Sequence, residues 1–198
     1  MSLYSEQNVT MWLLEPYAVW DKLQRVGYLY NGEGPDIISS TFPIQTEWMR
    51  GQLKNRVIGY EGRQPWWGWV KPKPDLRSWF SRGDQRELMV RIEIEVPRER
   101  TVLVNDSAWG EALNFAFLGP CKSEEQAEVF EKVRFTRNAF DALPSEYKAE
   151  MMSSWEHIFD LQGVLEMSDY SDAVIGAIEA LQLTDVKKVT KYYSRPRS

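Results

Sequence analysis

The sequence predicts an α+β fold, in which a small mixed or antiparallel sheet forms the core and helices pack around it. Apolar and polar residues alternate along residues 87–97, the pattern of a strand with one buried face. The other predicted strands and helices lack the regular alternation that is typical of a doubly wound sheet. The chain has 198 residues, which suits one domain, residues 1–198, with a sizeable core.

Five segments have the composition and the period of strands. They are residues 9–14, 66–70, 87–97, 101–105 and 186–193. In the segment WWGWV, a period of two places Trp67 and Trp69 on one face of the strand and Trp66 on the other. Two prolines within residues 71–77 remove backbone donors, so we expect an ordered loop there.

Helices are expected where apolar residues recur every three or four positions. The expected helices cover residues 15–27, 43–56, 107–118 and 123–142, and two more begin at Pro144 and at Ser168 or Asp169. Asp106 is expected to be the N-cap of the third, and Ser123, with a glutamine three residues later, has capping-box spacing. The last helix is expected to carry Val174, Ile178 and Leu181 on one face.

Composition limits the partners and the compartment. A net charge of −5 and a pI near 5.1 disfavour a surface built to neutralise nucleic-acid phosphates. A weak basic patch near the C-terminus comprises Lys187, Lys188, Lys191, Arg195 and Arg197. It would suit contact with nucleic acid or an acidic partner, but lysines that guard a strand edge against pairing explain it more simply. The first residues do not read as a signal peptide, and no apolar run reaches the ~20 residues that span a bilayer. A cytoplasmic protein without a membrane partner is therefore expected.

Common catalytic and phosphate-binding motifs are missing from the sequence. Neither G-x-x-x-x-G-K-[ST] nor G-x-G-x-x-G occurs. His157 is the one histidine and Cys121 the one cysteine, which excludes a zinc site built from several such ligands and disfavours a Ser-His-Asp triad. Any chemistry would rest on carboxylates, arginines, tyrosines or hydroxyls, and the sequence leaves open whether the chain is an enzyme.

A series of short segments, in order along nearly the whole chain, resembles the DUF3841 family of uncharacterised bacterial and phage domains. These segments are MWLLEPYAVWDKLQRVGYLY, TEWMRGQLKNR, WWGWV followed by KPDLR, VRIEIEVP, VLVNDSAWGEALN, SWEHIFDL and VKKVTKY. The resemblance implies one intact domain of that family. It implies no activity, because the family has none assigned.

The layout of the first half is also similar to small ADP-ribosyltransferase-like domains. The shared features are a strand, a helix that ends in GYL, and strands that close on IEIEVP and VL. This similarity implies NAD binding in a cleft between two small sheets. Trp12 stands on the first strand where such domains use arginine or histidine, and Glu111 is the candidate for their late glutamate.

Seven residues make up the candidate site. The expected ligand-binding residues are Trp12, Arg56, Trp67, Trp69 and Trp109, and the expected catalytic residues are Asp106 and Arg77. An arginine presents a planar fork that binds phosphate or carboxylate, and exposed indoles stack on flat ligands. Structural alternatives are an Asp75–Arg77 pair that holds a surface loop, Asp106 as a helix cap, and Trp109 in the core. For Arg56 the alternative, which is the simpler one, is a favourable interaction with the C-terminal dipole of its own helix.

Two classes of function fit these residues. The first is a nucleotide-binding protein, with NAD as a candidate cofactor, built around the tryptophans and arginines. The second is a non-enzymatic interaction factor, such as a phage or mobile-element inhibitor of a host protein. Carbohydrate binding through the WWGW segment fits less well, because these aromatic residues have a good alternative use in the core.

Overall fold

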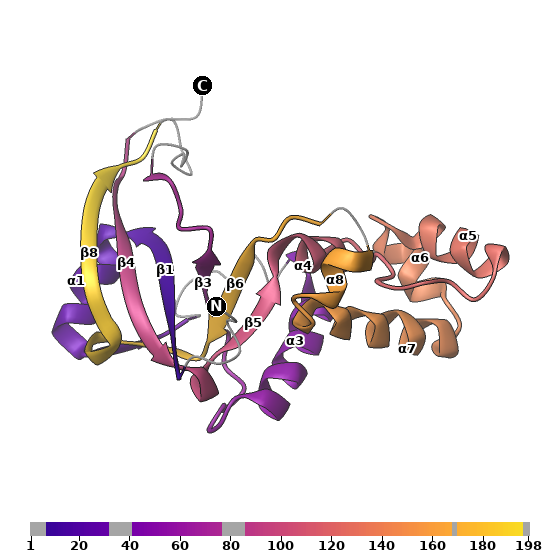
Figure 1. Cartoon of the computed structure of the whole chain (residues 1–198), viewed down its shortest axis with the longest axis horizontal. Helices are drawn as coiled ribbons and strands as arrows, with labels where there is room; N and C mark the ends of the chain where they lie inside the picture. The colour runs from indigo at the N-terminus through magenta and orange to yellow at the C-terminus, as the bar shows by residue number, and fades with distance from the viewer. Residues whose placement is uncertain (1–6, 32–40, 77–85, 168–169, 196–198) are drawn as a thin grey trace. The chain divides into compact units, whose positions relative to one another are not determined.

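The structure is a computed structural model, which describes residues 7–31, 41–76, 86–167 and 170–195 (Figure 1). The strands are β1 (Asn8–Pro16), β2 (Tyr28–Tyr30), β3 (Trp66–Lys71), β4 (Leu88–Pro97), β5 (Val102–Asn105), β6 (Val174–Ile178), β7 (Ala180–Gln182) and β8 (Val186–Tyr193). The α-helices are α1 (Tyr17–Val26), α3 (Pro43–Arg56), α4 (Asp106–Leu113), α5 (Glu124–Val133), α6 (Arg137–Ala142), α7 (Ser145–Ser154) and α8 (Gly163–Met167). The 3-10 helices are η2 (Arg98–Arg100), η3 (Trp155–Phe159) and η4 (Leu183–Asp185). These elements confirm the predicted α+β class.

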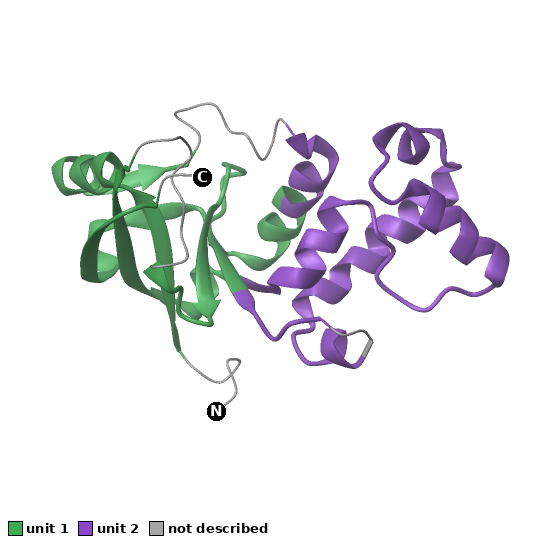
Figure 2. Cartoon of the chain, turned by 90° about the horizontal axis from the view of Figure 1, so that it is seen from above, with its two compact units in different colours: residues 1–36, 50–102, 175–198 green, residues 37–49, 103–174 purple. Residues whose placement is uncertain are grey.

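The chain divides into two compact units, shown in green and purple in Figure 2. Unit 1 comprises residues 1–36, 50–102 and 175–198, and unit 2 comprises residues 37–49 and 103–174. The six-stranded sheet has the order β5-β6-β3-β1-β4-β8, and β2 pairs with β7 separately. That the two units form the one domain expected from the sequence stays a prediction.

The centre of unit 1 is the antiparallel pair of β1 and β4. The two strands pair along their whole length, from Asn8 opposite Pro97 to Pro16 opposite Met89. Alternate side chains of both strands, such as Met11 and Ile92, are fully buried, as a period of two requires for a sheet with one packed face. β8 pairs with the other edge of β4 in the antiparallel sense. The alternation that predicted residues 87–97 as a strand is confirmed.

β3 confirms the predicted division of its tryptophans between two faces. Trp66 and Gly68 are buried, whereas Trp67 and Trp69 are partly exposed. A Cβ atom on Gly68 would lie 3.0 Å from Cε of Met11, so the glycine lets β3 pack closely against β1. The strand therefore places one indole in the core and two on the opposite face.

Unit 2 is built around aromatic side chains. Trp155 is fully buried and its Nε1 donates a hydrogen bond to the carbonyl oxygen of Ala116, 2.9 Å away. Its ring meets that of Trp48 edge-on at 5.5 Å, and Trp48 stacks on Trp109 at 6.4 Å. Such pairs stabilise by about 0.5–1.5 kcal/mol beyond the area that they bury.

Two predicted helices end earlier than the sequence suggested. α4 ends at Leu113 rather than residue 118, because Phe115 has a φ of 60° and Ala116 N donates to the Glu111 carbonyl oxygen. This hydrogen bond forms a Schellman motif in which phenylalanine stands where glycine is usual. The sequence therefore had no glycine to indicate the end of the helix. The helix predicted for 123–142 divides into α5 and α6, with Phe135 at a φ of 62° between them.

Two further predictions were wrong. A helix was predicted to begin at residue 168 or 169 and to carry Val174, Ile178 and Leu181. Val174 and Ile178 instead belong to strand β6, and Leu181 belongs to strand β7. Residues 168–169 themselves lie outside the described residues. β6 is a run of five buried residues, and a Cβ on its Gly176 would lie 2.8 Å from Met11 Cε, so this glycine accommodates close packing in the sheet. The N-cap of α4 is Asn105, whose side chain accepts from Ala108 N at 2.9 Å, and Asp106 is the first helical residue.

Candidate functional site

Two of the predicted ligand-binding tryptophans lie side by side in unit 1. Trp12 of β1 is the cross-strand partner of Trp69 of β3. Trp12 Nε1 donates to Glu93 Oε2 at 2.9 Å, and Lys73 Nζ lies 3.1 Å from the same oxygen and 5.0 Å from the Trp12 ring centroid. The hydrogen bond from Trp12, followed by that from Lys73, holds the pKa of Glu93 below its ordinary value. Trp12 is therefore held in place by polar contacts at its edge.

The other unit 1 predictions are less closely grouped. Trp67 is on the same face of β3 as Trp69 and is partly exposed. Arg56 is exposed at the end of α3, where its guanidinium contacts the Gln52 side chain of the same helix. Arg77 lies outside the described residues. The role of these residues in a shared site stays a prediction.

The two remaining predicted residues belong to unit 2. Trp109 is buried at 6% exposure, in the stack with Trp48. Asp106 is partly buried at the start of α4, and this burial raises the pKa of its carboxyl group. The predicted site residues that the structure describes are thus divided between the two units, and none of these lines either of the two cavities described below.

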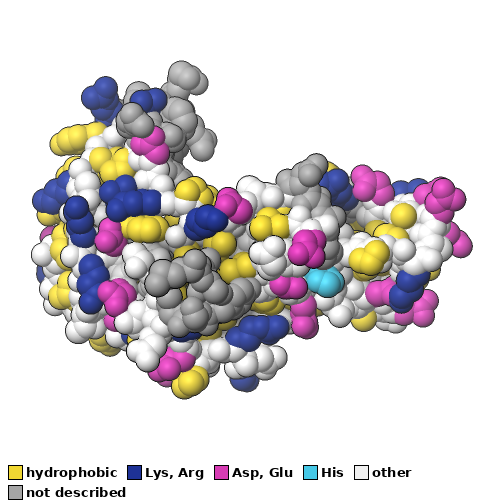
Figure 3. Space-filling view, viewed as in Figure 1, with side chains coloured by type: hydrophobic (Ala, Val, Ile, Leu, Met, Phe, Trp, Pro, Cys, Tyr) yellow, Lys and Arg dark blue, Asp and Glu magenta, His cyan; other side chains and the backbone are white. Residues whose placement is uncertain are grey.

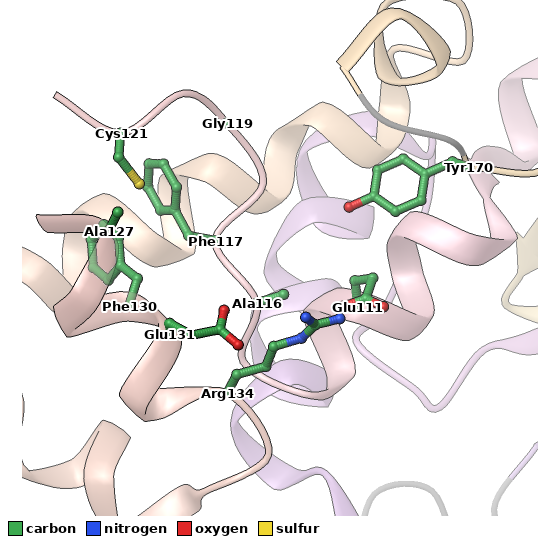
Figure 4. Close-up of a pocket in the computed structure, with 10 residues that line it drawn as sticks. All are labelled: Glu111, Ala116, Phe117, Gly119, Cys121, Ala127, Phe130, Glu131, Arg134 and Tyr170. Carbon is green, nitrogen blue, oxygen red and sulfur yellow. Dashed lines mark hydrogen bonds and ion pairs between the residues drawn. The ribbon is translucent and has the colours of Figure 1, made fainter. Parts of the chain in front are cut away.

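The larger of these two cavities lies within unit 2 and has a volume of about 330 Å³ (Figure 4). Its wall on one side is a single face of α5, whose side chains Ala127, Phe130 and Glu131 recur at helical spacing and continue to Arg134 at the helix end. The opposite wall comes from Glu111 of α4 and from the chain that follows it. We call this space the α5 cavity.

One end of the α5 cavity is polar. Arg134 and Glu111 form an ion pair across it, with 2.6 Å between the Arg134 nitrogen and the Glu111 oxygen. The Nε atom of Arg134 is buried and has no hydrogen-bond partner in the part of the chain that the structure describes. Figure 4 shows the Tyr170 ring on the same side of the cavity as this pair. The polar end therefore offers a carboxylate, a guanidinium and a phenol to a ligand.

Burial and charge set the protonation of the polar end. Burial, and then the negative charge of Glu111, raises the pKa of the Tyr170 phenol, while Arg134 opposes the rise. Tyr170 is therefore a hydrogen-bond donor at neutral pH. Glu131 also lines the cavity, so the lining contains two carboxylates, those of Glu111 and Glu131, and one guanidinium, that of Arg134. The balance of these charges is negative, which favours donor groups on a ligand and disfavours an additional anion.

The other end of the α5 cavity is aromatic. Phe117 and Phe130 stack with their ring centroids 4.4 Å apart and their planes 13° from parallel. Cys121 lies near this ring pair in Figure 4. Desolvation, and then the charge of Glu150, raises the pKa of the Cys121 thiol, so the thiol is a poor nucleophile at neutral pH. This end suits packing against a flat ligand surface better than covalent chemistry.

Sequence reasoning named one residue of this cavity and missed the others. Glu111 was the candidate for a late glutamate, and the structure pairs it with Arg134 at the polar end. A signal for the rest was present: Glu131 and Arg134 follow Phe130 on one helical face, so charged residues share a stripe with a buried ring. The bend at Phe115 brings the segment after α4 to the wall of the cavity opposite α5, and no sequence pattern predicted that bend.

The described residues form neither a cluster of metal ligands nor a membrane-spanning helix. Among the residues that the structure describes, no group of three or more His, Cys, Asp or Glu side chains could hold a metal ion. His157, in η3, is exposed and is not among the residues that line the α5 cavity. Across the same described ranges, no helix combines the length and the apolar character needed to cross a membrane.

Comparison with known proteins identifies the family. The model of the Domain of unknown function DUF3841 matches residues 10–180, which is most of the chain. The chain therefore belongs to the DUF3841 family, as the ordered sequence segments indicated. No curated protein and no solved structure matches the chain.

Proposed function

We propose that this member of the DUF3841 family is a nucleotide-binding protein, and that the α5 cavity takes the nucleoside part of the ligand. The single observation that carries the proposal is the pairing of a stacked phenylalanine pair at one end with a carboxylate, a guanidinium and a phenol at the other. A nucleoside combines a flat base with N–H and hydroxyl donors, which are the groups that these two ends accommodate.

The size and charge of the cavity narrow the ligand. Its volume of about 330 Å³ is near the lower end of the ~300–1,000 Å³ that is usual for ligand pockets. One nucleoside therefore suits it better than a whole dinucleotide, and NAD would place only one of its nucleosides there. Glu111 and Glu131 repel phosphate groups, so we expect phosphates to remain outside the cavity.

The test is a calorimetric titration at pH 7 with adenosine, guanosine, cytidine and uridine, each beside its 5′-monophosphate, and with NAD. We expect at least one nucleoside to bind, and to bind more tightly than its monophosphate. Replacing Glu111 by Gln or Arg134 by Gln should weaken that binding by about tenfold, because each removes one charged partner of a hydrogen bond.

The chain offers a matched control for these variants. Glu128 and Lys132 form an exposed ion pair on α5, 3.8 Å apart, and neither lines the α5 cavity. Glu128→Gln and Lys132→Gln should leave nucleoside affinity unchanged. The proposal fails if no compound of the panel binds, or if the cavity and control variants affect affinity equally.

A second candidate, the non-enzymatic interaction factor, has one feature of unit 1 in its favour. β8 is the last strand in the sheet order, and Tyr193 at its end is 65% exposed. An edge strand can pair with an extended segment of a partner protein. Lys187, Lys188 and Lys191 are exposed on this strand, and Figure 3 shows Lys and Arg side chains gathered over the region of β4 and β8, so an acidic partner would be required.

Hydrogen exchange distinguishes this second candidate. A partner that adds a strand would protect backbone amides of β8 when it is bound, because its carbonyl groups would pair with them. Unchanged exchange of β8 in the presence of a captured partner would exclude pairing at this edge.

A further inference from the structure

A second, smaller cavity in unit 2 lies where the start of α3 meets the end of α4. It has a volume of about 150 Å³ and shares none of its lining residues with the α5 cavity. Its walls include Phe42 and Gln45 from the region of α3, Phe115 after α4, and Phe135 and Arg137 around the start of α6. We call it the Gln45 cavity.

The amide of Gln45 is buried at 1% exposure and is only half satisfied. Its Nε2 donates to the carbonyl oxygen of Leu113 at 2.9 Å, which satisfies a carbonyl group in the last turn of α4. Because that partner is an acceptor, the nitrogen must face Leu113 and the orientation of the amide is fixed. The Oε1 atom of Gln45 is then left buried with no hydrogen-bond partner in the described ranges of the chain.

A buried acceptor without a donor is uncommon in folded proteins and requires an explanation. Gln45 is one of the residues that line the cavity. A leucine or methionine at this position would bury no unsatisfied oxygen, although it would lose the bond to Leu113. The amide therefore leaves one acceptor that a donor from outside the chain would satisfy.

Two residues with an unfavourable backbone conformation also line this cavity. Phe115 and Phe135 both line the Gln45 cavity and have φ values of 60° and 62°. A left-handed conformation is unfavourable for a bulky side chain, and such conformations cluster at binding sites. Phe135 N donates to the Asn114 carbonyl oxygen at 2.8 Å, which links the two bends. Phe135 is also 68% exposed, and the Arg134 guanidinium lies 5.0 Å from its ring centroid.

Charge and size limit the class of ligand. Arg137 is the charged residue among the described side chains that line this cavity, which disfavours a cation. Phenylalanine rings and Ile44 supply apolar and aromatic surface. A space of about 150 Å³ suits one small ring system rather than a complete nucleotide.

We propose that the Gln45 cavity is a separate binding site for a small, planar, uncharged heteroaromatic group whose N–H donates to Gln45 Oε1. The site does not depend on the α5 cavity, because the two share no lining residue. Failure of either proposal therefore leaves the other standing.

A pair of probes isolates the N–H group. Indole and benzofuran have the same two-ring shape, but only indole has a donor at the ring position in question. In a titration of ¹⁵N-labelled protein, we expect indole to shift the side-chain amide signals of Gln45 in a saturable way. Benzofuran should bind roughly tenfold more weakly, because it leaves the buried oxygen unpaired.

Variants connect the effect to this residue. Gln45→Met should reduce indole affinity to that of benzofuran, whereas Gln162→Met, which replaces an exposed glutamine of unit 2, should leave it unchanged. If Gln45→Met does not fold, Phe135→Ala removes an exposed ring of the cavity and should weaken indole binding, with exposed Tyr193→Ala of unit 1 as its control.

Three results would overturn the proposal. They are equal affinities for indole and benzofuran, Gln45 signals that do not move with either probe, and an indole affinity that neither Gln45→Met nor Phe135→Ala changes. The second result would indicate that ordered water alone satisfies Gln45 Oε1.

Discussion

In unit 1, the described residues with a positive φ are the glycines Gly27, Gly59 and Gly62, whereas in unit 2 they are Phe115 and Phe135. Glycine adopts this conformation without steric cost, but a phenylalanine pays about 1–2 kcal/mol for it. Unit 1 thus has glycine at its left-handed positions, where this conformation carries no strain. Unit 2 retains strain at the two residues that also line the Gln45 cavity.

The polar groups of the two units show a related difference. On the partly exposed face of the sheet in unit 1, Trp12 and Lys73 both bond to Glu93. In unit 2, Gln45 Oε1 and Arg134 Nε are buried without a hydrogen-bond partner in the described part of the chain, and both residues line cavities. In unit 1 the hydroxyl of Tyr192 is buried in the same way, but Tyr192 lines neither of these cavities. In unit 2 the unsatisfied groups and the strained residues coincide with cavities, so the comparison favours unit 2 as the ligand-binding part of the chain.

The largest expected effect concerns the aromatic core of unit 2. Trp155→Ala should lower the free energy of unfolding by about 3–5 kcal/mol, because it removes a fully buried ring and leaves a cavity. Urea denaturation followed by circular dichroism measures this change. If Trp155→Ala lowered the free energy of unfolding by less than about 1 kcal/mol, the core of unit 2 would not be packed tightly enough to hold strained residues. The contrast between the two units would then fail.

A smaller effect should differ in sign between the units. Gly59→Ala in unit 1 should destabilise by about 0.5–1 kcal/mol, since the glycine has a φ of 76° and open space around its Cα. Phe135→Gly in unit 2 should stabilise by a similar amount, because it relieves strain at an exposed residue. Thermal unfolding of both variants would show this. Destabilisation by Phe135→Gly would indicate that the ring contributes more packing than its exposure suggests.

The smallest effect depends on pH and concerns Glu93 in unit 1. Its pKa is lowered in the folded state, so its contribution is present above its unfolded pKa and is lost as the pH falls through the folded value. Glu93→Gln should therefore lower the melting temperature slightly at pH 7, by the equivalent of less than about 1 kcal/mol, and this deficit should shrink as the pH falls through the folded pKa of Glu93. Glu99→Gln, at an exposed residue of η2, serves as the control. A deficit that persists unchanged at acid pH would show that the carboxylate charge is unimportant there.

Sequence alone predicted the elements whose signals are local. The alternation of residues 87–97, the face assignment of Trp66 and the helix Pro43–Arg56 all follow from period or composition, and the structure confirms them. Residues 174–178 were placed in a helix because a short apolar run has no period that separates a buried strand from a helix.

The candidate site was less accessible to sequence reasoning. The tryptophans were conspicuous, yet Trp109 packs in the aromatic core and Trp12 is anchored by Glu93. The α5 cavity depends on the left-handed bend at Phe115. A glycine at this position would have indicated a turn, but a phenylalanine does not. Its polar end also depends on a pairing between Glu111 and Arg134, which are 23 residues apart in the sequence.

The most direct test of the central claim is to locate a bound nucleoside by intermolecular nuclear Overhauser effects, with the tightest-binding nucleoside of the calorimetric panel and protein labelled at phenylalanine and tryptophan. We predict contacts from the base protons to the rings of Phe117 and Phe130 in unit 2. Contacts confined to Trp12 and Trp69 of unit 1, or no contact with any of these rings, would contradict the account.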